Sequence, residues 1–276
     1  MTAATAPLAE PPLPAREVGW IWVRHLTCLL IPGNALLFLF TGPHPWYVAP
    51  LFMVPLVMAD QLDRSAKLEL RQPHQALPAW PFDTLVYLLA LMQLVSIVAL
   101  GRMFSQTTVF SADMLMVLVV VGGNSGFSII TAHELIHRSK RSEQWLGRLL
   151  LCTVLYEHFY TEHLRGHHVR VGTAEDPATA RFGESFRDFY RRTVPAQFRS
   201  AWRLEAKRLG DEQMALLDAR MLRNRILHGL AVGWGMALGG YWLGGGVALV
   251  AFLLQAVFAS RALAAVNYCE HWGLTR

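Results

Sequence analysis

Charged residues are scarce in this chain of 276 residues. They make up 16% of it, whereas about 25% is usual in soluble domains. Hydrophobic residues reach 53%, and the mean hydropathy is +0.30. A soluble two-domain protein, a disordered chain and a fibrous repeat are excluded, because each needs a more polar or a more periodic sequence. The composition indicates a polytopic membrane protein.

Two further features are missing. There are only three cysteines and no C-x-x-C pair, which argues against a disulfide framework or a cysteine zinc site. We expect Cys28, Cys152 and Cys269 to be reduced, buried apolar side chains. Residues 1–15 lack a basic start and an unbroken apolar run, so they are no signal peptide. We expect them to be a disordered cytoplasmic tail.

Apolar segments long enough to cross a bilayer recur along the remaining chain, which we treat as one domain, 16–276. A spanning helix needs about 20 residues. Glycine and proline are tolerated in such helices, since neighbouring helices can satisfy the freed backbone groups. The sequence therefore predicts an all-α fold with six transmembrane helices, near 18–40, 46–59, 83–101, 112–132, 226–243 and 247–268.

The basic residues predict the orientation. Of 25 Lys and Arg residues, 17 lie between Arg138 and Arg225, whereas the loops near 41–45 and 244–246 contain none. By the positive-inside rule, residues 133–225 and both termini face the cytoplasm, which agrees with an even number of spans. Residues 138–225 would form a cytoplasmic helical cap, and their basic surface would attract anionic lipid headgroups or an acidic soluble protein.

Six of the eleven histidines fall into three clusters. The first, H-E-L-I-H at 133–137, ends an apolar run and places His133 and His137 on one helix face. Polar groups at the end of a spanning helix are expensive unless they are functional. The pair therefore predicts a metal site at the cytoplasmic end of the fourth span.

The second cluster, E-H-L-R-G-H-H at 162–168, repeats the spacing with His163 and His167. The neighbouring His168 is turned by about 100°, so we expect it to face a different metal ion. The third cluster contains His271, at the cytoplasmic end of the sixth span. Structural roles are expected for the remaining histidines, His25, His44, His74, His158 and His228.

Six clustered histidines exceed the needs of one tetrahedral zinc ion. An imidazole-rich site for two redox metals, with iron as the leading candidate, fits them better. The apolar helices beside such a site could hold a lipid-like substrate.

The histidine clusters and two further motifs resemble the bacterial membrane-bound alkane 1-monooxygenases, which belong to the membrane fatty acid desaturase/hydroxylase superfamily. The motifs are H-E-L-I-H-R at 133–138, E-H-L-R-G-H-H at 162–168, D-P-A-T-A-R-F-G-E-S at 176–185 and N-Y-C-E-H-W-G-L at 267–274. The family has a further box, H-x-x-H-H, after the last motif. This box is not in the sequence, so we expect the domain to be truncated at its carboxyl end.

The resemblance implies a diiron enzyme of the bacterial inner membrane that hydroxylates the terminal methyl of medium- or long-chain alkanes with O2. The implied electron donor is rubredoxin, reduced by an NAD(P)H-linked reductase, and nucleic acid is not among the expected partners. The implied iron ligands are His133, His137, His163, His167, His168 and His271. Residues that could orient them by hydrogen bonds are Asp60, Glu134, Asp176, Asn267 and Glu270.

Other functions remain open at this point. A fatty acid desaturase or a xylene-type hydroxylase would use the same boxes. The first cluster also reads H-E-x-x-H, the motif of zinc metalloproteases, with Glu134 as the base and Glu157 as a third ligand. That interpretation leaves His163, His167, His168 and His271 without a role. A non-catalytic membrane protein that retains the boxes is the remaining alternative.

Overall fold

The computed structural model describes residues 13–65 and 77–273. Every regular element in these two ranges is a helix, which confirms the all-α prediction. Residues 1–12 of the predicted disordered tail, 1–15, lie outside the described residues, and helix α1 (Ala15–His25) begins at the last residue of that tail.

Four helical segments of the described chain are long and apolar enough to cross a membrane. A shorter apolar segment, Ala49–Gln61, corresponds to the predicted second span and lies in η2 (Ala49–Met53) and α3 (Val54–Ser65). The first long segment consists of α1, η1 (Leu26–Leu29) and α2 (Leu30–Thr41), and the second is α4 (Trp80–Phe104). The third consists of α5 (Ala112–Met116), the π-helical η3 (Val117–Val121) and α6 (Gly122–His137). The fourth is α11 (Arg225–His271).

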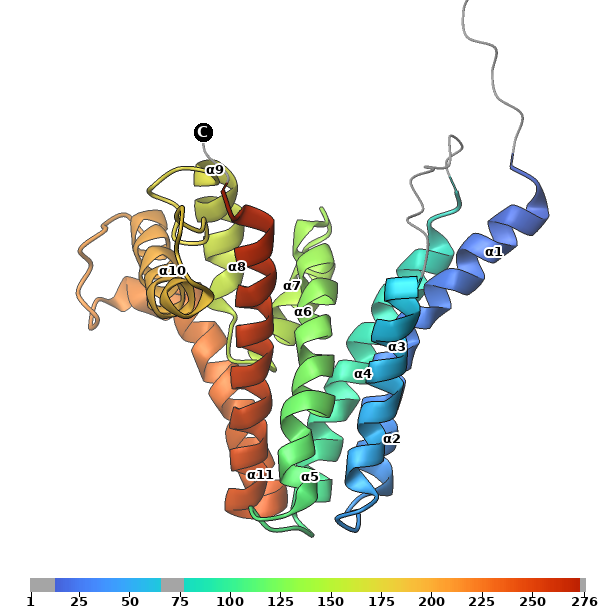
Figure 1. Ribbon diagram of the computed structural model, residues 1–276. Helices are drawn as coiled ribbons and strands as arrows, with labels where there is room; N and C mark the ends of the chain where they lie inside the picture. Colours follow the sequence, from blue (N-terminus) through green and yellow to red (C-terminus); the bar gives the residue numbers. More distant parts are fainter. Residues whose placement is uncertain (1–12, 66–76, 274–276) are drawn as a thin grey trace, which may run out of the picture.

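Helix α11 turns back on itself at Gly244 and Gly245. Gly245 has φ 67° and ψ −163°, a conformation that only glycine adopts without strain. The two halves of α11 meet at the lower end of the bundle in Figure 1. They correspond to the predicted segments 226–243 and 247–268, with the turn at the predicted loop 244–246.

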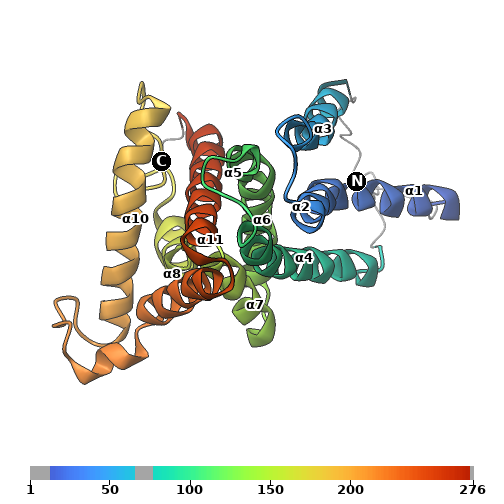
Figure 2. The ribbon, with the colours of Figure 1, turned by 90° about the horizontal axis from the view of Figure 1, so that it is seen from below.

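Three of the connections between helices lie at one end of the bundle, and the last turns of α6 and α11 lie toward the other. Loop 42–48, loop 105–111 and the turn of α11 lie at the lower end in Figure 1, whereas the last turns of α6 and α11 lie toward the upper end. Figure 2 shows α10 running beside the bundle, where it packs against α8 and α11. The upper part is completed by short elements and α10: α7 (Arg141–Cys152), α8 (His158–Glu162), η4 (His163–His167), α9 (His168–Arg170), α10 (Phe186–Arg208) and η5 (Ala219–Arg223).

Close packing of α7 on α6 supports the histidine-bearing end of α6. A Cβ atom at Gly147 would lie 2.8 Å from the Ala132 carbonyl oxygen and 2.8 Å from Cγ2 of Ile136. Glycine therefore permits an approach that any larger residue would prevent. The apolar cluster around this contact includes Leu135 and Leu151, which are fully buried.

A buried polar network joins three of the long helices. Gln93 of α4 donates from Nε2 to Ser125 Oγ and Thr153 Oγ1, each at 3.1 Å, and its Oε1 accepts from Asn124 Nδ2 at 2.9 Å. Gln255 of α11 donates to the Thr153 carbonyl oxygen at 2.8 Å. Such bonds orient helices inside a membrane, where apolar packing alone gives little directional preference.

The histidines outside the clusters have local partners. His44 lies against Asp113, with 2.8 Å between Nδ1 and Oδ1, and the pair connects the loop after α2 to α5. The rings of His25 and His228 lie 2.7 Å from the carbonyl oxygens of Ile21 and Leu222. His158 is buried, and its ring packs edge-on against Phe198. His74 lies outside the described residues.

The cysteine prediction is partly wrong. All three cysteines are free and Cys152 is buried, but Cys28 and Cys269 are exposed. The apolar character of the surrounding sequence therefore did not decide the burial of Cys28 and Cys269.

Replacing Gln93 by leucine should destabilise the bundle. The variant loses three side-chain hydrogen bonds and leaves Asn124 without its acceptor, which should lower the free energy of unfolding by about 2 kcal/mol. Unfolding titrations in mixed micelles measure the change. Gln106→Leu, at an exposed position, is the matched control and should change stability little. Equal stability of the two variants would contradict a role for the network.

His158 should make stability depend on pH. Burial lowers the pKa of His158 from 6.5 to about 4. Between these values the unfolded chain binds a proton that the folded chain does not, so stability is lost as the pH falls from about 6.5 toward 4. At pH 5 the loss should be about 2 kcal/mol. The melting temperature should therefore fall more between pH 7 and pH 5 in the unmodified protein than in His158→Phe. His228→Phe should retain the full fall, and identical pH profiles for all three proteins would disprove the assignment.

Candidate metal centre

Four histidines from two separate segments converge at the upper end of the bundle. His133 and His137 lie on consecutive turns at the end of α6, and His163 and His168 come from η4 and α9. One ligand nitrogen from each of the four rings lies within 4.8 Å of the other three. The fold therefore brings the first two histidine clusters together.

His163 is at the centre of this group. Its Nε2 lies 2.8 Å from Nε2 of His133, 3.1 Å from Nε2 of His137 and 3.0 Å from Nε2 of His168. A ring nitrogen carries either one proton or one in-plane lone pair, so it cannot make three hydrogen bonds. A cation among the four lone pairs satisfies all of them at once. Neighbouring ligands at right angles, each about 2.1 Å from an ion, are about 3 Å apart, so these distances fit a metal ion.

The helical geometry of the second cluster differs from the prediction. His163–His167 is π-helical, with hydrogen bonds that span five residues instead of four. This wider turn places His168, five residues after His163, beside the His133–His137 pair. His167 faces elsewhere, and its ring is stacked on that of His163 with centroids 5.4 Å apart. The structure thus groups His168, and not His167, with His133, His137 and His163.

His167 and His271 form a second group. The ring centroids of His167 and His271 are 4.7 Å apart. Nδ1 of His167 lies 2.9 Å from Asp176 Oδ2, and Nδ1 of His271 lies 2.8 Å from the Asn267 carbonyl oxygen. Because both Nδ1 atoms are engaged, Nε2 of each ring is the atom that could bind a metal.

Asp176 is itself held in place. It is buried, and it accepts hydrogen bonds from Thr179 Oγ1 at 2.6 Å and from the Ala178 backbone N–H at 3.1 Å. Burial tends to raise the pKa of Asp176, but the hydrogen bonds from His167 and Thr179 outweigh it, so the pKa lies below its usual value. The carboxyl is therefore ionised at neutral pH and keeps the proton of His167 on Nδ1.

His163 and His168 are neutral at physiological pH. Burial and the neighbouring imidazoles lower the pKa of His163 and His168. Neutral imidazole is the form that binds metal ions. The buried Glu162 lies next in the chain, and burial raises its pKa to about 7; its Oε1 accepts hydrogen bonds from Arg170 and Ser200.

The other predicted orienting residues lie in different surroundings. Glu134 is exposed and accepts a hydrogen bond from Arg138 at 3.2 Å. Asp60 is exposed in α3 and pairs with Arg64 at 2.9 Å. Glu270 is exposed near the end of α11. Asn267 acts on His271 through its backbone carbonyl, so any side chain at this position could provide that contact.

Two features of the site were not predicted. Phe159 stacks on His163 with centroids 4.6 Å apart and planes at 17°, which covers one face of the central ring. It lies four residues before His163, on the same helical face, and this spacing is the signal that could have identified it. Glu157, expected as a third zinc ligand in a metalloprotease, instead pairs with Arg148, whose Nε lies 2.5 Å from its Oε1.

Comparison with known proteins identifies the family of this chain. The model of the fatty acid desaturase family matches residues 108–276. Alkane 1-monooxygenase 1 of Pseudomonas aeruginosa is 42% identical over 154 residues, which are 54% of this chain and 38% of that protein. Alkane 1-monooxygenase 1 of Alcanivorax borkumensis is 35% identical over 166 residues, 59% of this chain and 40% of that protein.

A third relative is the alkane 1-monooxygenase of Pseudomonas putida, 33% identical over 167 residues, which are 59% of this chain and 40% of that protein. The matched region thus spans about two fifths of the length of these relatives. The range matched by the family model, residues 108–276, contains all three histidine clusters. The chain therefore belongs to the fatty acid desaturase family, together with the alkane 1-monooxygenases.

Proposed function

We propose that this protein is a membrane diiron monooxygenase that converts the terminal methyl of medium- or long-chain alkanes to a primary alcohol, using O2. The observation that carries the proposal is the convergence of four imidazole nitrogens within 4.8 Å, beside the second pair His167 and His271. The names of the relatives supply the substrate class. Electrons would come from rubredoxin, reduced by an NAD(P)H-linked reductase.

The two histidine groups divide the ligands between two iron ions. His133, His137, His163 and His168 would hold one ion, and His167 and His271 would contribute to the second. Iron bound there supplies the activation of O2. Asp176 keeps the His167 ring in the orientation that presents Nε2, and Phe159 keeps water from one face of His163.

The apolar helices below the histidines suit the proposed substrate. An alkane has no polar group, so only burial of its chain can hold it, at about 0.8 kcal/mol per CH2. Affinity should therefore rise with chain length until the enclosed space ends. A desaturase or a xylene-type hydroxylase of the same family would use the same histidines and differ in how the substrate lies against them.

For the topology, we propose six spans with both termini and the histidine clusters on the cytoplasmic side of a bacterial inner membrane. Two observations support it: the histidine-bearing ends lie opposite loop 42–48, loop 105–111 and the turn of α11, and 17 of 25 basic residues lie between Arg138 and Arg225. This orientation would place the basic segment 138–225 where a soluble electron donor could reach it.

Loss of a central ligand should remove both metal and activity. The iron content and octane oxidation of His163→Ala, with reduced rubredoxin and O2, should fall at least tenfold, because His163 contacts three other ring nitrogens. Asp176→Ala should weaken iron binding about 10- to 100-fold through the freed His167 ring. His228→Ala, outside both groups, is the matched control and should retain iron and activity.

The product distinguishes the candidate functions. With 18O2, a hydroxylase yields labelled 1-octanol, whereas a desaturase yields an alkene without label. Zinc in place of iron, with peptide hydrolysis and no alcohol, would identify a metalloprotease and overturn the proposal. Equal iron content in His163→Ala and His228→Ala would show that the four-histidine group is not the metal site.

Orientation can be tested independently of activity. A reporter that is active only in the cytoplasm, fused after Gly210, should be active, because this position lies between α10 and η5 in the basic segment. The same reporter placed at Gly245, in the turn of α11, should be inactive. Activity at Gly245 and none at Gly210 would invert the proposed topology.

A further inference from the structure

A buried carboxylate lies at the start of the π-helical turn that groups the histidines. Glu162 ends α8 directly before η4, and it is fully buried. Its Oε1 accepts from Arg170 Nη2 at 3.2 Å, across the whole of η4. Figure 1 shows α8 and α9 one above the other toward the upper end of the bundle. The pair therefore connects the helix before the turn to the helix after it.

Two further contacts hold Arg170. Its Nε donates to the Gly166 carbonyl oxygen at 3.2 Å, inside the turn, and its Nη2 donates to Ser200 Oγ of α10 at 2.7 Å. Ser200 Oγ also donates to Glu162 Oε1 at 3.3 Å. Guanidinium suits this position because its donors point in fixed directions. Glu162, Arg170 and Ser200 thus form a clasp that holds the turn at both ends and in its middle.

Gly166 leaves room for the clasp. A Cβ atom at this position would lie 2.5 Å from Arg170 Nη2 and 2.5 Å from Glu162 Oε1. Any side chain there would push the two groups apart. The backbone of Gly166 is helical, so the clasp, and not an unusual conformation, explains the glycine.

The clasp can close only in the π-helical register. In an α-helix, residues eight positions apart are about 80° apart around the axis. A π-helical turn takes up one extra residue, so Glu162 and Arg170 come to within about 20° of one another. In the α-helical register, position 169 would lie over Glu162. That position is a valine, which offers no charge to a buried carboxylate.

We propose that Glu162 and Arg170 are positioning residues that hold η4 in the π-helical register. This register selects His168, and not His167, as the fourth histidine of the group, because an α-helical turn would present the residue four positions after His163. The role rests on the proposed function, in which the two histidine groups hold different iron ions. The clasp would then decide which ligands each ion receives.

Pairs of cysteines can report the register. The ring centroids of His137 and His168 are 4.9 Å apart. His137→Cys with His168→Cys should therefore be joined by dibromobimane, which fluoresces once both thiols have reacted. His137→Cys with His167→Cys is the comparison pair. Both are made with serine at the exposed Cys28 and Cys269 and are studied in nanodiscs without metal. We expect the 137/168 pair to crosslink about fivefold more, or better.

Opening the clasp should remove this preference. Arg170→Leu deletes the donor, and Gly166→Ala pushes the clasp apart and favours the α-helix. In either variant the ratio of 137/168 to 137/167 crosslinking should fall about fivefold or more. Gly166→Ala keeps every charged group, so it gives the answer even where Arg170→Leu does not fold. Arg165→Leu, the same change at an exposed position of η4, is the matched control and should retain the ratio.

Two results would overturn the proposal. One is an equal ratio in Arg170→Leu, Gly166→Ala and Arg165→Leu, and the other is stronger crosslinking of the 137/167 pair while the clasp is intact. Failure of the proposed function would look different. The crosslinking needs neither iron nor O2, so absence of alkane hydroxylation would leave the ratios unchanged, and loss of the preference would not alter the product of the unmodified protein.

Discussion

The crowding of ring nitrogens around His163 is the constraint on which the rest of the site depends. Three other Nε2 atoms lie within 3.1 Å of its Nε2, an arrangement that one proton cannot satisfy. It persists only because several elements hold it. Gly147 lets α7 approach α6 behind His133 and His137, Phe159 covers the His163 ring, and the π-helical turn brings His168 around to the same point.

The long helices supply the rigidity that this end of the molecule needs. Apolar side chains alone would let helices rotate and slide in a bilayer, since lipid is as apolar as they are. The bonds of Gln93 to Ser125 and Thr153 fix the rotation of α4 against its neighbours, and Gln255 fixes α11. The end of α11 carries His271, so the same bonds help to determine where His271 meets His167.

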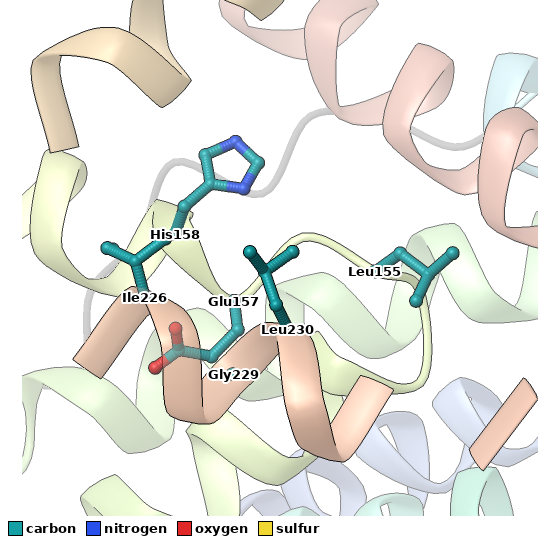
Figure 3. Close-up of a pocket in the computed structure, with 6 residues that line it drawn as sticks. All are labelled: Leu155, Glu157, His158, Ile226, Gly229 and Leu230. Carbon is teal, nitrogen blue, oxygen red and sulfur yellow. The ribbon is translucent and has the colours of Figure 1, made fainter. Parts of the chain in front are cut away.

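A buried carboxylate outside the histidine groups is also held by a specific partner. Glu157 is buried at a position where an unpaired charge would be unfavourable, and Arg148 compensates it from α7. Only one of its oxygens is used in this way. The other oxygen, Oε2, is buried, has no hydrogen-bond partner within the described chain and lies against Gly229 of α11 (Figure 3).

The sequence by itself determined the all-helical fold, most of the long apolar segments and the residues of the three histidine clusters, because hydrophobic runs and i, i+4 spacing are local properties. It also indicated the turn at 244–246, which the backbone of Gly245 realises. The tertiary structure alone decided how the histidines are grouped. A rule based on 3.6 residues per turn cannot detect a π-helical turn. Only the folded chain therefore shows that His168, and not His167, joins the group around His163. Likewise, H-E-x-x-H with a downstream glutamate is compatible with a zinc site, and only the packing of α7 directs Glu157 to Arg148 instead. Partners far apart in the chain are chosen by packing, and no local pattern encodes that choice.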